Sequence, residues 1–97
     1  MKIRNFLHKG LRRLHDENDP KKELPAPSID KLRKMMGDLE TIEDWGELRN
    51  VPVWKAHLLA GRRKGTWSLQ VTRNWRMTFW INEAEYEICD VNFEDYH

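Results

Sequence analysis

The sequence has little that would support a disulfide framework, a membrane span or a signal for export. Its 97 residues contain one cysteine, which excludes an intramolecular disulfide and a zinc cage built from cysteines. Charged residues interrupt every apolar run well before the roughly 20 residues that a transmembrane helix needs. The basic start, Met1–Phe6, lacks the apolar run and the cleavage site of a signal peptide. We therefore expect a cytoplasmic protein with no membrane partner.

The familiar sequence motifs of several enzyme classes are also missing. No serine lies in a nucleophile elbow, no glycine-rich loop could cradle a phosphate, and no pair of residues has the spacing of a metal-ligand motif. A chain this short is expected to form one domain over residues 1–97 and to have shallow clefts. An extended ligand suits such a surface better than a small metabolite. Cys89 lies in an apolar stretch, and we expect it to be a packing residue.

The formal net charge of +1 hides a strong segregation of charge along the chain. Residues 51–76 carry six basic residues and no acidic residue, whereas residues 77–97 carry six acidic residues and no basic residue. The basic block predicts a surface that attracts anions. The simpler alternative is a solvated basic face without a ligand.

Apolar residues recur at steps of three and four in two segments of the first half, about 8–18 and 29–45, which predicts two amphipathic helices. The intervening segment 19–27 contains three prolines and is expected to form a loop. Ser28 is well placed to cap the second helix. A short first strand is expected at residues 2–6.

After Pro52 the apolar period changes to two, which is typical of strands joined by short turns. The strands are expected at about 53–59, 66–72, 75–81 and 86–93. Glycine and asparagine in the three joins would tolerate the positive φ that tight hairpin turns require. The sequence thus predicts an α+β fold in which two N-terminal helices pack on one face of a small, mostly antiparallel sheet.

Alternation along each strand assigns side chains to the two faces of this sheet. The core candidates are Trp54, Ala56, Leu58, Trp67, Leu69, Val71, Trp75, Met77, Phe79 and Ile81. The other face receives Lys55, His57, Ser68, Gln70, Thr72, Arg76, Thr78 and Trp80. One face of an antiparallel sheet is commonly solvated, so a polar face needs no function by itself. Candidate RNA-binding residues are those of this face and its neighbouring turns: Lys55, Arg62, Arg63, Lys64, Arg73 and Trp80.

The last four residues, Glu94–His97, include several side chains that can exchange or orient protons. The alternative is a frayed, solvated tail. An unperturbed histidine has a pKa of about 6.5 and can act as a general acid or a general base. Of the four histidines, His8 and His15 are expected to be surface residues of the first helix, which leaves His57 and His97 as candidates for chemistry.

Cleavage of RNA by its own 2′-hydroxyl needs a base, an acid and a cation at the phosphate, and it requires no metal. His57, Asp95 and His97 can supply the acid, the base and their orientation. Arg76 offers a planar fork for phosphate, and Tyr96 can stack on a base. A metal site formed by Asp95, His97 and His57 is an alternative that their spacing does not favour.

Four segments, Lys55–Gly61, Gly65–Leu69, Asn74–Phe79 and Glu94–His97, together resemble the RelE superfamily of bacterial toxins, specifically its HigB-type branch. Further matching residues, Phe6 and His8–Leu11, and the layout with two helices extend the resemblance over essentially the whole chain.

The resemblance implies a ribosome-dependent endoribonuclease that cuts mRNA in the decoding site, without a cofactor. It also implies an antitoxin of the HigA type, which is a helix-turn-helix protein. The toxin would contact operator DNA only through this antitoxin. The active-site residues that it implies are His57, Arg76, Asp95, Tyr96 and His97.

One position departs from the pattern of the family. Toxins of this type often carry a lysine before the glycine that is Gly61 here, and this chain has Ala60. Loss of that phosphate contact would weaken binding or catalysis unless Arg62, Arg63 or Arg73 replaces it.

Two functions without catalysis stay open at this point. The same basic face could bind the ribosome or RNA and block translation by occupancy alone, or it could bind an acidic protein partner. A terminal Asp-Tyr-His favours catalysis over occupancy, because occupancy needs cations and aromatic rings but no proton transfer.

Overall fold

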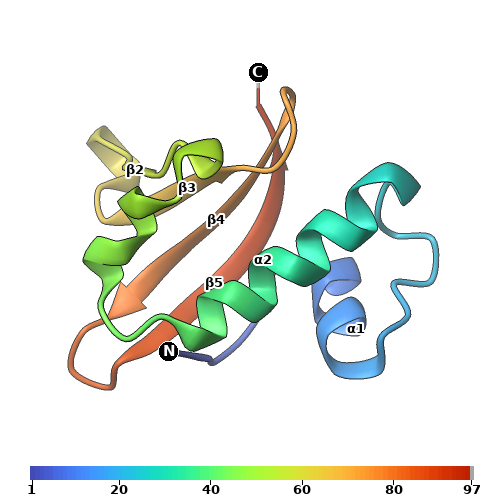
Figure 1. The fold of residues 1–97 in the computed structure, drawn as a ribbon, viewed down its shortest axis with the longest axis horizontal. Coiled ribbons are helices and arrows are strands. Elements are labelled where there is room, and N and C mark those ends of the chain that lie inside the picture. Colours follow the sequence, from blue (N-terminus) through green and yellow to red (C-terminus); the bar gives the residue numbers. More distant parts are fainter. Residues whose placement is uncertain (97) are drawn as a thin grey trace.

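A five-stranded sheet organises the computed structural model, which describes residues 1–96 (Figure 1). The strands are β1 (Lys2–Ile3), β2 (His57–Leu58), β3 (Thr66–Gln70), β4 (Trp75–Asn82) and β5 (Glu87–Asp95). Their order is β1-β5-β4-β3-β2; β1 runs parallel to β5, and the other neighbours are antiparallel. The three longest strands lie within a few residues of their predicted positions.

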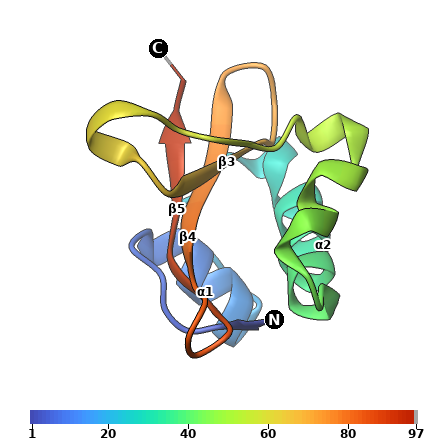
Figure 2. The same cartoon turned by 90° about the vertical axis from the view of Figure 1, so that its left-hand side faces the viewer.

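Two α-helices, α1 (Lys9–Glu17) and α2 (Ile29–Thr41), pack against one face of the sheet through a shared core. Both views show α2 on one side of the sheet, away from the loop at residues 60–65 (yellow) (Figure 2). This arrangement confirms the predicted α+β class. Within residues 1–96, no helix is both long and apolar enough to cross a membrane.

The core lies between the helices and the face of the sheet that alternation assigned to it. Cys89 is buried, as expected for a packing residue, while Trp75 and Ile81 are only partly buried. The largest fully buried side chains come from both layers: Leu11, Leu32, Met35, Leu39, Leu48, Leu69, Val71, Met77, Phe79, Ile88 and Val91.

The strand predicted at 53–59 is wrong for most of its length. Pro52–Trp54 forms a 3₁₀ helix, and Lys55 has a left-handed φ of 46° that interrupts the extended chain. Only two residues of this segment pair with β3. Leu58 pairs with the buried Trp67 and so lies on the predicted face, but β2 is an edge strand and Leu58 is 46% exposed, so it is not a core residue.

The predicted ends of the second helix also need correction. Ser28 occupies the predicted N-cap position of α2, but it also ends a preceding 3₁₀ helix and its side chain makes no capping hydrogen bond. The helix ends at Thr41, and residues 45–50 form a separate 3₁₀ helix. Asp44 starts this second piece through a capping box with Glu47, which explains why the helical pattern continued beyond α2.

The hairpin turns differ in part from expectation. Gly61 and Gly65 have positive φ values of 67° and 91°, as the turn argument required. Asn74 and Asn82 do not have positive φ. In the β4–β5 turn the residue with positive φ is Tyr86, with a φ of 59°. The β3–β4 turn is closed by hydrogen bonds between Thr72 and Trp75 instead.

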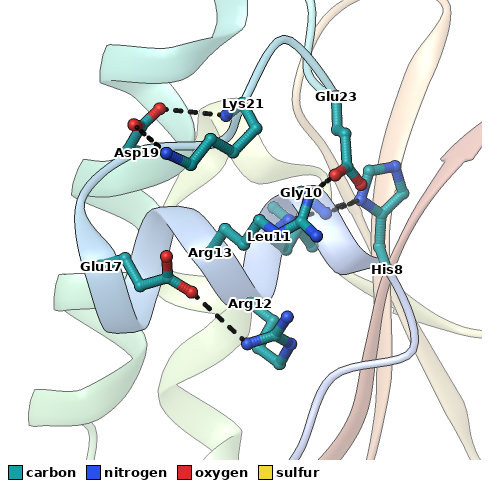
Figure 3. A network of polar contacts seen from close by, with 9 residues as sticks. All are labelled: His8, Gly10, Leu11, Arg12, Arg13, Glu17, Asp19, Lys21 and Glu23. Carbon is teal, nitrogen blue, oxygen red and sulfur yellow. Dashed lines mark hydrogen bonds and ion pairs between the residues drawn. The ribbon is translucent and has the colours of Figure 1, made fainter.

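His8 is a structural residue and not the surface residue that its setting suggested. Its Nδ1 accepts hydrogen bonds from the backbone N–H groups of Gly10 (3.0 Å) and Leu11 (3.3 Å), which caps α1 (Figure 3). Its ring lies edge-on to Phe93 at 5.8 Å. A Cβ on Gly10 would lie 2.9 Å from the His8 ring, so the close approach requires glycine. His15 bonds Asp16 and Glu40 and so links α1 to α2.

This cap predicts a specific dependence of stability on pH. Burial lowers the pKa of His8 below 6.5, so the unfolded chain binds a proton at this site more readily than the folded chain. The contribution of His8 to stability is therefore complete above pH 6.5 and is lost as the pH falls from there through the lowered pKa. His8→Asn keeps a capping oxygen without titrating in this range, so its stability should decline less between pH 7.5 and 5. Chemical denaturation of both proteins across this range measures the difference, and parallel curves would contradict the role of His8.

Candidate active site

The sheet face opposite the helices, here called the open face, carries most of the polar side chains that alternation placed there. His57 pairs with Ser68, and Ser68 pairs with Thr78, so these three residues form one row across the strands. Two residues before Thr78 on β4, Arg76 pairs with Glu94 on β5. Ser68 and Thr78 are nevertheless buried.

Arg76 and Tyr96 come together at the end of the open face. The Arg76 guanidinium lies 4.0 Å from the centre of the Tyr96 ring. Its Nη1 donates hydrogen bonds to the carbonyl oxygens of Thr72 (2.9 Å), Arg73 (3.2 Å) and Trp75 (3.1 Å). Arg76 thus stabilises the β3–β4 turn through Nη1, and the plane of its guanidinium contacts the Tyr96 ring.

The chain end is held beside this turn. The backbone N–H of Tyr96 donates to the carbonyl oxygen of Asn74 at 2.6 Å, and β5 continues to Asp95. Figure 1 shows the end of β5 next to the β3–β4 connection. Residues 94–96 are therefore held by strand pairing and by this hydrogen bond and are not a frayed tail. His97 lies outside the described residues.

Asp95 occupies a different register position from the other candidates. It pairs with Trp75, which belongs to the core face, and it lines the same depression as Arg76 and Tyr96. That depression has a volume of about 210 Å³ and is lined by Leu59, Arg63, Ser68, Arg76, Thr78, Glu94, Asp95 and Tyr96. The structure therefore brings Arg76, Asp95 and Tyr96 together.

His57 lies on the same face but near its far edge. Its register position is about 12 Å from that of Arg76 if strands are about 4.8 Å apart and residues rise about 3.3 Å. The His57 Nδ1 lies 3.1 Å from the carbonyl oxygen of Lys55, which can only accept, so Nδ1 carries a proton and donates it. In the neutral ring, Nε2 is then the proton acceptor and is directed away from this bond.

A pair that the sequence interpretation missed lies in the middle of the open face. Glu94 accepts a bidentate interaction from Arg63, with distances of 3.0 and 2.6 Å, and a hydrogen bond from the hydroxyl of Thr78. Arg63 was expected to bind RNA, but its charge is compensated by this carboxylate. Alternation along β5 was the signal that could have found the pair, because it places Asn92 and Glu94 on the face of Thr78 and Arg76.

The protonation of Glu94 follows from the same contacts. Burial alone would raise its pKa, but the hydrogen bonds from Arg63 and Thr78 and the charge of Arg63 outweigh burial and lower the pKa below 4.5. Glu94 is therefore a carboxylate at neutral pH. It stabilises one orientation of Arg63 above the depression.

The remaining cationic candidates are exposed at both ends of the open face. Arg62 and Lys64 lie in the loop before β3, whose first residue pairs with Trp80. Arg73 lies in the turn beside Arg76, and Lys55 precedes β2. Among residues 1–96, no ion pair involves these four side chains: Lys55, Arg62, Lys64 and Arg73. They are therefore available to an anionic ligand.

Comparison with solved structures defines the class of fold. The chain resembles YafQ from E. coli strain BL21(DE3), with a TM-score of 0.58 and 14% identity over 97% of this chain and 89% of that one. It also resembles a YoeB/ParE toxin from Agrobacterium tumefaciens, with a TM-score of 0.59 and 15% identity over 100% and 99% of the two chains. At these identities the likeness shows that the fold is shared.

Sequence comparison places the chain within this class. The family model described as the RelE-like toxin of type II toxin-antitoxin system HigB matches residues 4–97. The chain is 40% identical over 96 residues to a protein named endoribonuclease HigB from Proteus vulgaris, covering 98% of this chain and 99% of that one. The chain belongs to the HigB family of RelE-like toxins, as its sequence motifs had indicated.

Proposed function

We propose that this chain is the toxin of a type II toxin-antitoxin pair and an endoribonuclease that cuts mRNA on the translating ribosome. The observation that carries the proposal is the meeting of Arg76 and Tyr96 in a shallow depression, on a face with exposed cations at both ends. A relative with 40% identity bears the name of an endoribonuclease, which supports the same activity here. A shallow face suits a strand of mRNA better than a small substrate.

The proposed reaction is an internal transfer at one phosphate. The ribose 2′-oxygen attacks the adjacent phosphorus, and the bond from phosphorus to the 5′-oxygen breaks. One of His57 and His97 accepts the proton of the 2′-hydroxyl, and the other protonates the leaving 5′-oxygen. The products are a 2′,3′-cyclic phosphate and a 5′-hydroxyl.

The other candidates hold and stabilise the reacting groups. Arg76 stabilises the negative charge that develops on the phosphate oxygens, and its position is fixed by the turn carbonyls before substrate arrives. Tyr96 offers a ring for stacking on a base. Asp95, which lines the same depression, orients the terminal histidine. Side chains alone can fill the roles of acid, base and cation.

We extend the proposal to the partners of the toxin. A HigA-type helix-turn-helix antitoxin neutralises it in the cytoplasm, either by covering the open face or by making the toxin too bulky for the ribosome. Operator DNA is contacted only through that antitoxin. A gene for a small helix-turn-helix protein beside this one would support the pairing.

The direct test uses purified ribosomes translating a defined mRNA. The proposal expects cut ends at defined positions in that mRNA and no cutting of the same mRNA without ribosomes. Arrest of translation without cut ends would favour inhibition by occupancy. The alternative has some support, because Ala60 replaces the lysine that such toxins often carry and Glu94 compensates Arg63.

Binding to the programmed ribosome should weaken steeply as salt is raised, because exposed cations act through phosphate contacts that release counterions. Each phosphate contact with single-stranded RNA contributes about −0.7 to the slope of log K against log salt. Replacing Arg62, Lys64 and Arg73 together by alanine should therefore make the slope shallower by about 2. Filter binding at several potassium concentrations measures the slope for the parent protein and for the variant.

A charge-matched control separates local contacts from net charge. Lys22, Lys31 and Lys34 lie in the proline-rich loop and α2, on the helical side. Their triple replacement removes the same charge and should leave the slope nearly unchanged. Equal slopes for all three proteins would exclude the open-face cations from binding.

A further inference from the structure

Trp80 is an exposed aromatic ring with a fixed orientation on the open face. Its side chain is 39% exposed, and its indole N–H donates to Asp90 Oδ2 at 2.9 Å. Asp90 is itself held by Asn5, which donates from Nδ2 to Oδ1 at 2.7 Å and accepts from the Asp90 backbone N–H at 2.9 Å. The only hydrogen-bond donor of the indole is thus satisfied within the protein, and the exposed part of the ring is apolar.

The ring borders a second depression on the same face, with a volume of about 140 Å³. This depression shares Arg63, Thr78 and Glu94 with the one that contains Arg76 and Tyr96, so the two adjoin at the Arg63–Glu94 pair. Trp80 and Arg76 are four residues apart on β4, which corresponds to about 13 Å at about 3.3 Å per residue. A strand of RNA with one phosphate at Arg76 would bring a flanking nucleotide to Trp80.

The charges around Trp80 select the part of a nucleotide that fits there. The carboxylates of Asp90 and Glu94 both line the depression, and the only cation among its lining residues, Arg63, is already paired with Glu94. A phosphate would be repelled, whereas a neutral base could stack on the ring. The exposed cations Arg62 and Lys64, in the adjacent loop, can bind the phosphates of the RNA backbone.

We propose that Trp80 and the depression beside it form a nucleobase-binding subsite for a nucleotide flanking the cleaved bond. The subsite rests on the proposed endoribonuclease function, and it gives the mRNA a second contact point besides Arg76. Stacking on an aromatic ring tolerates any base, so the subsite contributes affinity and register more than sequence preference.

The test measures single-turnover cleavage of a defined mRNA on purified ribosomes as a function of toxin concentration. Trp80→Ala should raise the half-saturating concentration roughly 5- to 140-fold, the range expected for the loss of one stacked base, with little change in the rate at saturation. Trp80→Phe should stay near the parent protein, and Trp80→Leu should behave like Trp80→Ala. Tyr86→Ala is the matched control, because Tyr86 is a similarly exposed aromatic residue (44%) in the β4–β5 turn.

Messages with one abasic nucleotide near the cut identify the stacked base. At one position the missing base should weaken the parent protein as much as Trp80→Ala does, and the two changes together should add nothing further. Additive effects at every position would overturn the subsite, and so would parent-like cleavage by Trp80→Ala. Loss of antitoxin binding with unchanged cleavage would assign the surface to the protein partner instead. If the parent protein itself cuts no message, the proposed function fails and the subsite fails with it.

Discussion

His97→Ala is expected to reduce mRNA cleavage on ribosomes by about 10²- to 10⁴-fold, the usual contribution of a general acid or base. Ribosome binding should change little, because proton transfer contributes to the transition state and not to the ground-state complex. The residue before it, Tyr96, is hydrogen-bonded to Asn74 and stacks with Arg76, so the chain is held beside Arg76 as far as residue 96. Single-turnover rates at saturating toxin, with cosedimentation for binding, measure the two effects separately.

Controls distinguish lost chemistry from lost order at this chain end. His97→Gln keeps a side chain of similar size that cannot transfer the proton, and it should lose as much activity as alanine. A variant with extra residues after His97 keeps the imidazole and tests whether the end must be free. Cleavage by His97→Ala at the parent rate would transfer the catalytic role to His57 or Asp95.

Arg76→Ala is expected to abolish growth inhibition and to lower cleavage by about 10²- to 10³-fold, as for loss of one group that stabilises transition-state charge. It should also lower the free energy of unfolding by about 1–2 kcal/mol, because the turn carbonyls of Thr72, Arg73 and Trp75 lose a charged donor. Substitutions at the surface usually shift stability by no more than about 0.5 kcal/mol, and the contacts of Arg76 with the turn raise that expectation. Urea denaturation and single-turnover cleavage measure the two effects.

The conservative variant separates the two roles of Arg76. Arg76→Lys keeps a positive charge but has no planar fork, so stability should partly return while cleavage stays low. Arg12→Ala, which removes an exposed arginine from α1, should alter neither property. Growth inhibition at the parent level by a folded Arg76→Ala protein would show that this guanidinium does not stabilise the phosphate.

Alternation predicted the sheet well wherever the chain stays extended. It separated Met77 and Phe79, which are buried against the helices, from Arg76 and Trp80 on the open face. It failed at Leu58, which shares a face with the buried Trp67 but lies on the two-residue edge strand β2 and is exposed. The position of a strand at the edge of the sheet, which the hydrophobic period does not encode, explains the error.

The site was predictable in its residue types but not in its pairings. The Asp-Tyr-His ending and Arg76 stood out by their chemistry, and the structure brings Arg76, Asp95 and Tyr96 to one depression. Sequence position alone could not show that Arg63 would reach Glu94, because the loop at 60–65 must first fold back over the sheet. Contacts between segments far apart in sequence depend on the tertiary fold.

The central claim is that this chain cuts mRNA through the 2′-hydroxyl of the message itself. The most direct measurement compares two messages on purified ribosomes, identical except that one carries a single 2′-deoxynucleotide on the 5′ side of the mapped cut. The mechanism predicts 2′,3′-cyclic phosphate and 5′-hydroxyl ends from the normal message, and no cut at that bond in the substituted one. Cleavage of the substituted message at the same bond and rate would contradict the account.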